Sequence, residues 1–314
     1  MAPSDIILHW YPLSPFAQKV AWVLNFKNID YKVVQISPIE PRPLRRPLDG
    51  GYRKTPILQI GNHVYCDTKC IIDELEKRYP EPSIYPKTKT GESSESLGKG
   101  LAVWLETLLF GSVSRQFDVS LLPEKFRNDR NEFLRQKFGG GSPFMKLDLL
   151  AQLAMAEKLL GDKTYLLDTP TLSMVDLSLA KSMFFLSNVA GPDFVEQQAP
   201  RLAAHMQRVF AEAKMTRTET MPKLKAEQAI ELAQQQYQPL NTQEAPATSV
   251  LSELKIGQEV MVTPLDTGRV PSIGILRSLT DNTVVIEHKT DKVTSFIHFP
   301  SFGFIVTPPP KPSL

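Results

Sequence analysis

The first 80 residues alternate between short apolar runs and stretches in which apolar side chains recur at helical spacing. Residues 6–11 and 31–36 predict strands, and the apolar positions between them predict a helix that ends at about residue 27. The connection through residues 38–47 holds too many prolines for regular structure. Residues 57–65 predict a hairpin, and a helix that ends before Pro80 follows it. This order is typical of an α/β unit.

Residues 94–236 change to a helical pattern throughout, and strand signals nearly vanish. A polar stretch at 118–141 ends in three glycines, so we expect a loop there with at most a short helix. Residues 237–250 have the composition of a linker. The predicted helices lie near residues 95–117, 143–160, 173–187, 200–214 and 222–236.

The last part of the chain returns to short β-type runs between residues 259 and 307, separated by turn residues. Runs of this length and number predict a small β-barrel of four or five strands. The expected fold class is therefore α+β multidomain. Its predicted domains are an α/β domain at 1–85, an all-α domain at 90–238 and a small β-barrel at 250–307.

Charge and composition narrow the functional classes. The 314 residues carry a net charge of +2, so the strong basic excess that nucleic-acid binding requires is missing. No apolar run approaches the ~18 residues of a membrane span, and the N-terminus lacks the apolar core of a signal peptide. Cys66 and Cys70 are too few for a disulfide framework and favour two buried thiols. We expect a cytoplasmic protein without a metal site, a nucleic-acid partner or a membrane partner.

The most informative residues lie where the first strand passes into the first helix. Ser14 suits the N-cap position of that helix, and Pro15 suits its first turn. A hydroxyl beside the free N–H groups of a helix N-terminus favours an anion such as a thiolate. The alternative is that Ser14 only caps the helix.

Polar residues also stand at the start of the predicted hairpin and at the start of the second helix. Thr55-Pro56 opens the hairpin; a cis Pro56 would turn the Thr55 backbone toward an extended peptide ligand, whereas a trans proline is the ordinary alternative. Asp67 and Thr68 begin the second helix and suit an amino acid's ammonium and carboxylate groups. Simple helix capping explains each of these two residues alone.

These three motifs, in this order and followed by an all-helical half, resemble the cytosolic glutathione transferases over residues 6–236. The resemblance implies a thioredoxin-like first domain. It also implies that Ser14 activates the thiol of glutathione, that Pro56 is cis, and that the Thr55 backbone holds the cysteinyl part. Asp67 and Thr68 would grip the γ-glutamyl group. The complete three-domain layout is similar to that of a fungal group of glutathione-transferase-like proteins.

Other residues enter through the same resemblance. Tyr11 is a rival thiol activator, because relatives of the tyrosine type place the phenol near the end of the first strand. Arg53 and Lys54 are the best candidates for the glycyl carboxylate, although a solvated basic loop is the alternative. Ser173 and Asp176 match a structural capping box of the family.

The space for a second substrate is predicted between the first unit and the helices. Its candidate walls are apolar and can equally be plain core. A single histidine on the third domain, His298, could also reach this space, although packing is the commoner role of such a residue. The candidate walls are Tyr11, Leu13, Trp104, Phe110 and Phe117.

The implied activity is that of a glutathione-dependent transferase, with glutathione as co-substrate and a small, hydrophobic electrophile as acceptor. Because a serine forms no mixed disulfide, thiol-disulfide reductase activity is disfavoured. Two alternatives stay open: a catalytically silent binding or scaffold protein, and a glutathione-dependent isomerase or lyase in small-molecule biosynthesis. The family also pairs as homodimers, and the added C-terminal strands could block or replace that surface.

Overall fold

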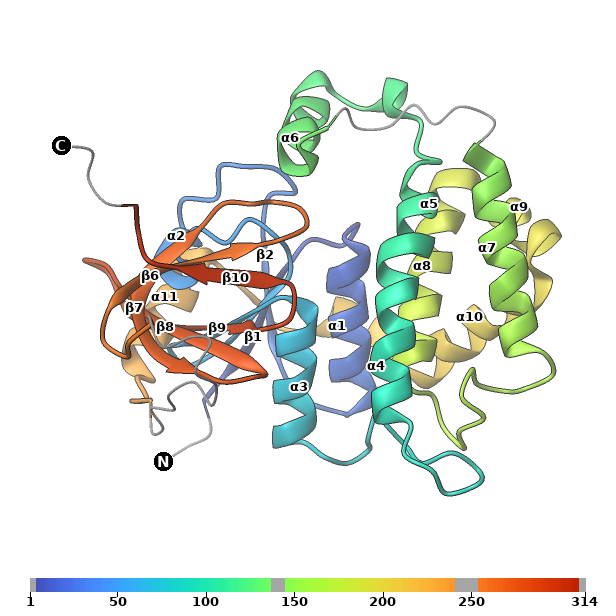
Figure 1. The fold of residues 1–314 in the computed structure, drawn as a ribbon, viewed down its shortest axis with the longest axis horizontal. Helices are drawn as coiled ribbons and strands as arrows, with labels where there is room; N and C mark the ends of the chain where they lie inside the picture. The colour runs from blue at the N-terminus through green and yellow to red at the C-terminus, as the bar shows by residue number, and fades with distance from the viewer. Residues whose placement is uncertain (1–3, 137–144, 241–253, 311–314) are drawn as a thin grey trace.

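The computed structural model describes residues 4–136, 145–240 and 254–310. Figure 1 shows a sheet on one side, α1 and α3 beside it, and the other long helices beyond these two. Ten strands of the described residues form one sheet in the order β10-β6-β7-β8-β9-β4-β3-β1-β2-β5. No helix among the described residues is both long enough and apolar enough to cross a membrane.

The N-terminal elements confirm the predicted α/β unit and its thioredoxin-like arrangement. β1 pairs in parallel with β2 and antiparallel with β3, and β3 pairs antiparallel with β4. Both faces of β1 are buried, which is why its sequence is a continuous apolar run rather than an alternating one. These elements are β1 (Ile6–Trp10), α1 (Pro15–Phe26), β2 (Lys32–Gln35), β3 (Ile57–Ile60), β4 (His63–Cys66) and α3 (Thr68–Arg78).

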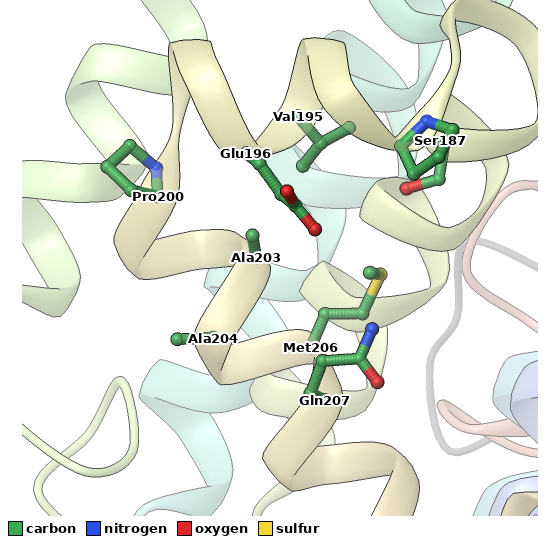
Figure 2. A pocket seen from close by; sticks show the side chains of 9 residues that line it. Ser187, Val195, Glu196, Pro200, Ala203, Ala204, Met206 and Gln207 are labelled. Carbon is green, nitrogen blue, oxygen red and sulfur yellow. The ribbon is translucent and has the colours of Figure 1, made fainter.

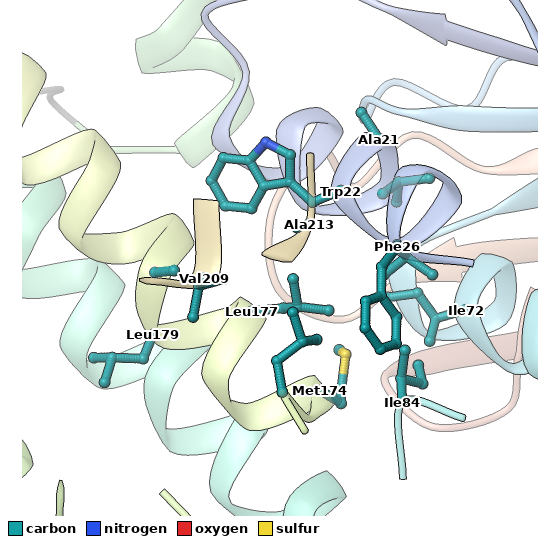
Figure 3. Packing of buried hydrophobic residues seen from close by; sticks show 14 of the residues in the cluster. Ala21, Trp22, Phe26, Ile72, Ile84, Met174, Leu177, Leu179, Val209 and Ala213 are labelled. Atoms are coloured by element: carbon teal, nitrogen blue, oxygen red, sulfur yellow. The ribbon is translucent and has the colours of Figure 1, made fainter. Parts of the chain in front are cut away.

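The helical half packs on the outer side of α1. Figure 3 shows Trp22 and Phe26 of α1 facing Leu177 of α8 and Val209 of α10. The Trp22 side chain is fully buried, and its ring lies 5.1 Å from that of Phe210. The larger helical elements are α4 (Glu95–Trp104), the π-helical η1 (Leu105–Leu109), α5 (Phe110–Ser114), α7 (Met145–Leu160), α8 (Met174–Ala190), α9 (Pro192–Gln198) and α10 (Pro200–Glu212).

Four local expectations are corrected. The stretch predicted to be a loop contains an eleven-residue helix, α6 (Glu124–Leu134), which buries none of its residues and so carries no apolar stripe in the sequence. The proline-rich connection contains a single helical turn, α2 (Arg46–Asp49), since Pro47 suits a first turn. The predicted helix at 222–236 splits into β5 (Lys223–Leu224) and α11 (Ala226–Gln235). The short helix α9 was missed.

The structure does not confirm a separate C-terminal β-barrel. β9 pairs in parallel with β4, through His63↔Phe296 and Val64↔Ile297, so the C-terminal strands continue the N-terminal sheet. The fold class is therefore corrected to one large mixed sheet that two parts of the chain share. The C-terminal strands are β6 (Glu259–Pro264), β7 (Ser272–Leu279), β8 (Thr283–Lys289), β9 (Thr294–Pro300) and β10 (Phe304–Thr307).

Two sequence predictions lie wholly or partly outside the described residues. These are the glycine run at 139–141 and most of the linker at 237–250. The domain boundaries at 1–85, 90–238 and 250–307 stay a prediction. Two short 3₁₀ segments complete the description, η2 (Val119–Leu121) and η3 (Met215–Thr220).

Candidate functional site

The sheet register gathers the predicted site residues at one end of the sheet. Ile57 of β3 pairs with His9 of β1 on one side and with Cys66 of β4 on the other. Because both ladders are antiparallel, the residues just before Ile57 lie next to the residues just after His9 and just after Cys66. Thr55–Pro56 and Asp67–Thr68 therefore meet at the end of the sheet where α1 begins.

Ser14 occupies the N-cap position of α1, as predicted. Its Oγ accepts a hydrogen bond from the Ala17 N–H at 3.3 Å, and its own N–H donates to the Tyr11 carbonyl at 3.0 Å. The residue is only 3% exposed. Within the described part of the chain the hydroxyl makes this one bond, as an acceptor, so its hydrogen is available for donation to an anion.

The other two predicted motifs, Thr55–Pro56 and Asp67–Thr68, have well-defined local conformations. The Thr55–Pro56 peptide bond is cis. Asp67 is the N-cap of α3, where its carboxylate accepts the Lys69 N–H at 3.0 Å. The Asp67 backbone has φ 72°, a conformation that residues other than glycine rarely adopt and that is concentrated at functional sites. Thr68 is buried, and its Oγ1 accepts a hydrogen bond of 3.4 Å from the Lys19 Nζ.

The arginines of the connection at residues 38–54 are held by contacts within the protein. Arg45 is buried, forms an ion pair of 2.5 Å with Asp49, and donates from Nη1 to the Thr55 Oγ1 at 3.2 Å. Burial, together with the nearby Arg45 guanidinium, lowers the pKa of Arg42 to about 10. Arg42 and Arg45 therefore hold the segment that leads to Thr55, through hydrogen bonds to the Arg53 carbonyl and the Thr55 hydroxyl.

Arg53 and Lys54, the two predicted carboxylate ligands, are both engaged in ion pairs. Arg53 is buried and pairs with Asp129 at 3.1 Å and with Glu132 at 2.9 Å, both on α6. The Lys54 Nζ lies 2.5 Å from the Asp266 carboxylate, in the turn between β6 and β7. Sequence reasoning missed these partners because α6 and the C-terminal strands are distant along the chain.

His298 and Tyr11 are placed differently from each other. Tyr11 directly follows the last residue of β1 and is half-buried, and its carbonyl accepts the Ser14 N–H, so it stays next to the site. His298 lies on β9, where its ring stacks on Tyr65 with centroids 4.4 Å apart. Its Nε2 lies 2.9 Å from the Nδ1 of His63, and burial lowers the pKa of His298 well below its usual value. These contacts favour the packing role for His298.

A buried charged cluster joins the site to the helical half, and the sequence analysis did not identify it. Lys19 of α1 pairs with Glu106 of η1, and Glu106 also accepts a 2.8 Å hydrogen bond from Ser178 of α8. Lys181 lies one turn after Ser178, and its side chain is fully buried. Burial alone would raise the pKa of Glu106, but the two lysines and the hydrogen bonds lower it to about 2. The sequence signal for this cluster is Lys181, a lysine inside the apolar run of the helix predicted at 173–187.

A surface pocket of about 270 Å³ lies away from these residues, between α9, α10 and the end of α8. Figure 2 shows Glu196, Met206 and Gln207 around it. None of its lining residues comes from the N-terminal elements. It is therefore separate from the site built on Ser14.

Comparison with known proteins agrees with this geometry. A family model described as "Glutathione S-transferase, N-terminal domain" matches residues 8–83. A curated relative from Solanum tuberosum, described as a probable glutathione S-transferase, is 24% identical over 138 residues. That match covers 40% of this chain and 63% of the relative, so the chain spans less than two thirds of its length.

Similarity to solved structures extends further along the chain. A GST-like protein from Pseudomonas syringae is 28% identical, with a TM-score of 0.75, and the match covers 96% of this chain and 100% of that one. This likeness therefore extends over nearly the whole of both chains. A glutathione S-transferase from Methylobacterium radiotolerans, in complex with glutathione sulfonate, has the same fold at 20% identity and a TM-score of 0.52, over 70% of this chain and 96% of that one. The family match thus places a glutathione S-transferase N-terminal domain at residues 8–83, and over nearly its whole length the chain is similar to a GST-like protein.

Proposed function

We propose that this chain is a glutathione-dependent transferase that activates the glutathione thiol at Ser14 for attack on a small hydrophobic electrophile. The observation that carries the proposal is the convergence of Ser14, Thr55–Pro56 and Asp67–Thr68 at one end of the sheet. Glutathione would lie extended along the Thr55 backbone, as an added strand does. The two buried free cysteines agree with a reduced compartment such as the cytoplasm.

Ser14 supplies the proposed chemistry in two ways. Its free hydroxyl hydrogen donates to the sulfur anion, and the N-terminus of the twelve-residue helix α1 adds a favourable dipole. Both effects favour the thiolate, which is the nucleophilic form. The bound thiol loses its proton to solvent, and its sulfur then forms a bond to the electrophilic atom of the acceptor. In a substitution a leaving group departs from that atom with its bonding electron pair. In an addition the electron pair of the acceptor's double bond moves to the neighbouring atom, which takes a proton from solvent. Tyr11 is the rival donor, because it is joined to Ser14 by a backbone hydrogen bond.

The γ-glutamyl end is assigned to the start of α3. The Asp67 carboxylate would accept from the γ-glutamyl ammonium, and the Thr68 hydroxyl would donate to the γ-glutamyl carboxylate. Lys54 is the better of the two candidates for the glycyl carboxylate. Its partner Asp266 is 64% exposed, so the pair can exchange, whereas Arg53 is buried between two acids.

Titration of the bound thiol tests the role of Ser14. A hydrogen bond to a charged group contributes about 1.5–3 kcal/mol, so Ser14→Ala should raise the pKa of the bound thiol by roughly one to two units. The thiolate is followed by its absorbance at about 240 nm. Ser93→Ala is the matched control, since the Ser93 hydroxyl also accepts a backbone N–H, near the start of α4. An unchanged titration in Ser14→Ala with a raised pKa in Tyr11→Phe would move the role to Tyr11.

A catalytically silent binding protein is the second candidate. The observation that favours it is that Arg53 and Lys54 already have carboxylate partners. Calorimetry with millimolar glutathione separates the two: the transferase predicts binding, and the absence of heat favours the silent protein. A glutathione-dependent isomerase or lyase would use the same site residues and differ in its products.

The proposed homodimer has to accommodate the C-terminal strands. β9 pairs with β4, so β4 is not a free edge of the sheet. We therefore propose that a homodimer does not form by edge-to-edge pairing of two β4 strands. Mass measured in solution tests whether the chain is a monomer or a dimer.

A further inference from the structure

Lys181 is a buried lysine whose amine makes no hydrogen bond among the described residues. Its side chain is fully buried in α8, and its Nζ finds no hydrogen-bond acceptor within the described part of the chain. A buried ammonium normally pairs with an acid or an acceptor, because leaving water costs several kcal/mol otherwise. The nearby Glu106 pairs through its Oε1 with Lys19 and accepts at the same oxygen from Ser178, and no hydrogen bond from Lys181 reaches it. The cluster therefore contains two lysines around Glu106.

Two aromatic rings replace the missing acceptor. The Lys181 Nζ lies 4.0 Å from the centre of the Phe16 ring and 4.4 Å from the centre of the Phe110 ring. The negative face of an aromatic ring attracts a cation, but it does not accept the hydrogens as a carboxylate does. The ammonium is thus held in place without being neutralised.

The same rings connect Lys181 to the proposed sulfur site. Phe16 lies in the first turn of α1, two residues after Ser14. Phe16 and Phe110 are half-buried and their centroids are 4.9 Å apart. Phe185 continues the row at 5.4 Å from Phe110. An apolar body stacked on these rings would lie beside the sulfur of a glutathione bound at Ser14.

We propose that Lys181 recognises a carboxylate on the second substrate, so that the acceptor is a flat, unsaturated carboxylic acid rather than a neutral electrophile. This inference rests on the proposed function, and it specifies the substrate class of the same site. The carboxylate would pair with the Lys181 ammonium when the Phe16 ring turns aside, and the unsaturated body would stack on Phe110 and Phe185. A neutral acceptor would leave the ammonium unpaired.

Charge around Lys181 agrees with this assignment. The titratable groups that face it are Glu106 on η1 and Lys19 on α1. Burial lowers the pKa of Lys181 to about 7, against the opposing effect of Glu106. A bound carboxylate would supply a second anion and raise that pKa. Binding should therefore be strongest where the amine is protonated, and it should weaken as the pH rises.

Calorimetry with a matched pair of probes tests the proposal on the full chain. Cinnamate and its neutral amide, cinnamamide, share the flat unsaturated body and differ in charge. Wild-type protein at about pH 6 should bind cinnamate at least about tenfold more tightly than cinnamamide, and the preference should shrink at about pH 9. Lys181→Met should abolish the preference, whereas Lys158→Met, an exposed lysine of α7, should keep it. Equal binding of both probes, no binding of either, or a preference kept by Lys181→Met would overturn the proposal.

A second measurement does not depend on any variant folding. In wild-type protein with labelled lysines, NMR should show one lysine that titrates near neutrality and whose pKa rises by about one unit or more with cinnamate. A spectrum in which no lysine responds to cinnamate contradicts the proposal. Glutathione binding is measured separately: if glutathione binds and cinnamate is not preferred, only the substrate class fails. If cinnamate is preferred and glutathione does not bind, the transferase assignment fails instead.

Discussion

Replacing Lys181 with methionine should stabilise the protein at neutral pH. Burial moves the pKa of this amine from 10.5 to about 7. A difference of about 3.5 units at 1.36 kcal/mol per unit means that keeping the charged amine in the fold costs about 5 kcal/mol. The Phe16 and Phe110 rings return about 2 kcal/mol or more through their contacts with the cation. Methionine has a similar length and no charge, so Lys181→Met should gain about 1–3 kcal/mol of unfolding free energy.

The pH dependence gives this prediction its sign. The folded-state pKa of Lys181 lies below the unfolded value, so the cost is fully present below about pH 7. This free-energy cost falls as the pH rises from about 7 to 10.5, because in that range the Lys181 amine is neutral in the folded protein and still protonated in the unfolded chain. The advantage of Lys181→Met over wild type should therefore be largest near neutrality and smaller near pH 10, as measured by urea denaturation.

Two results would contradict the expected stabilisation by Lys181→Met. A variant less stable than wild type at pH 7 would mean that the ring contacts outweigh desolvation. A stability difference that does not change with pH would mean that the Lys181 amine keeps an ordinary pKa in the fold. Lys158→Met, at an exposed position, should change stability by less than about 0.5 kcal/mol and serves as the control.

Other substitutions test separate contacts. Asp67→Asn keeps the cap and removes the charge, so the glutathione Kd should rise about tenfold or more in calorimetry; an unchanged Kd contradicts the γ-glutamyl assignment. Lys54→Met should weaken binding of glutathione but not of its glycyl ester, and equal losses for both would exclude a carboxylate contact. Glu106→Gln leaves buried ammonium groups without a counter-charge and should cost about 3–5 kcal/mol in urea denaturation, whereas a loss below about 1 kcal/mol would count against the cluster. The pKa values of His63 and His298 are lowered from 6.5, so wild-type stability should fall as the pH drops below 6.5, and His298→Gln should make that slope shallower; an unchanged slope contradicts this.

The N-terminal unit could be predicted because its signals are local. Ser14 and Pro15 mark a helix start by their own conformational preferences, and the hairpin is fixed by Gly61, which has φ 60° at its turn. The Ser173–Asp176 capping box was likewise readable: the Ser173 N–H donates to the Asp176 carboxylate at 2.8 Å. In each case the residues that determine the structure are close neighbours in the sequence.

The remaining features depend on contacts between distant segments. β4 and β9 are more than 200 residues apart, and nothing in either strand specifies which edge the other will join. α6 has no buried face, so its position depends on the ion pairs between Arg53 and its acids. Lys181 lies among apolar residues of α8, and only the folded structure shows that its Nζ lies against two aromatic rings and, among the described residues, makes no hydrogen bond.

A crystal structure of the full chain with glutathione shows directly whether glutathione binds with its sulfur at Ser14. We expect the sulfur within hydrogen-bonding distance of the Ser14 Oγ and the γ-glutamyl end at Asp67 and Thr68. Glutathione found at another place on the protein, or no glutathione at millimolar concentration, would contradict it.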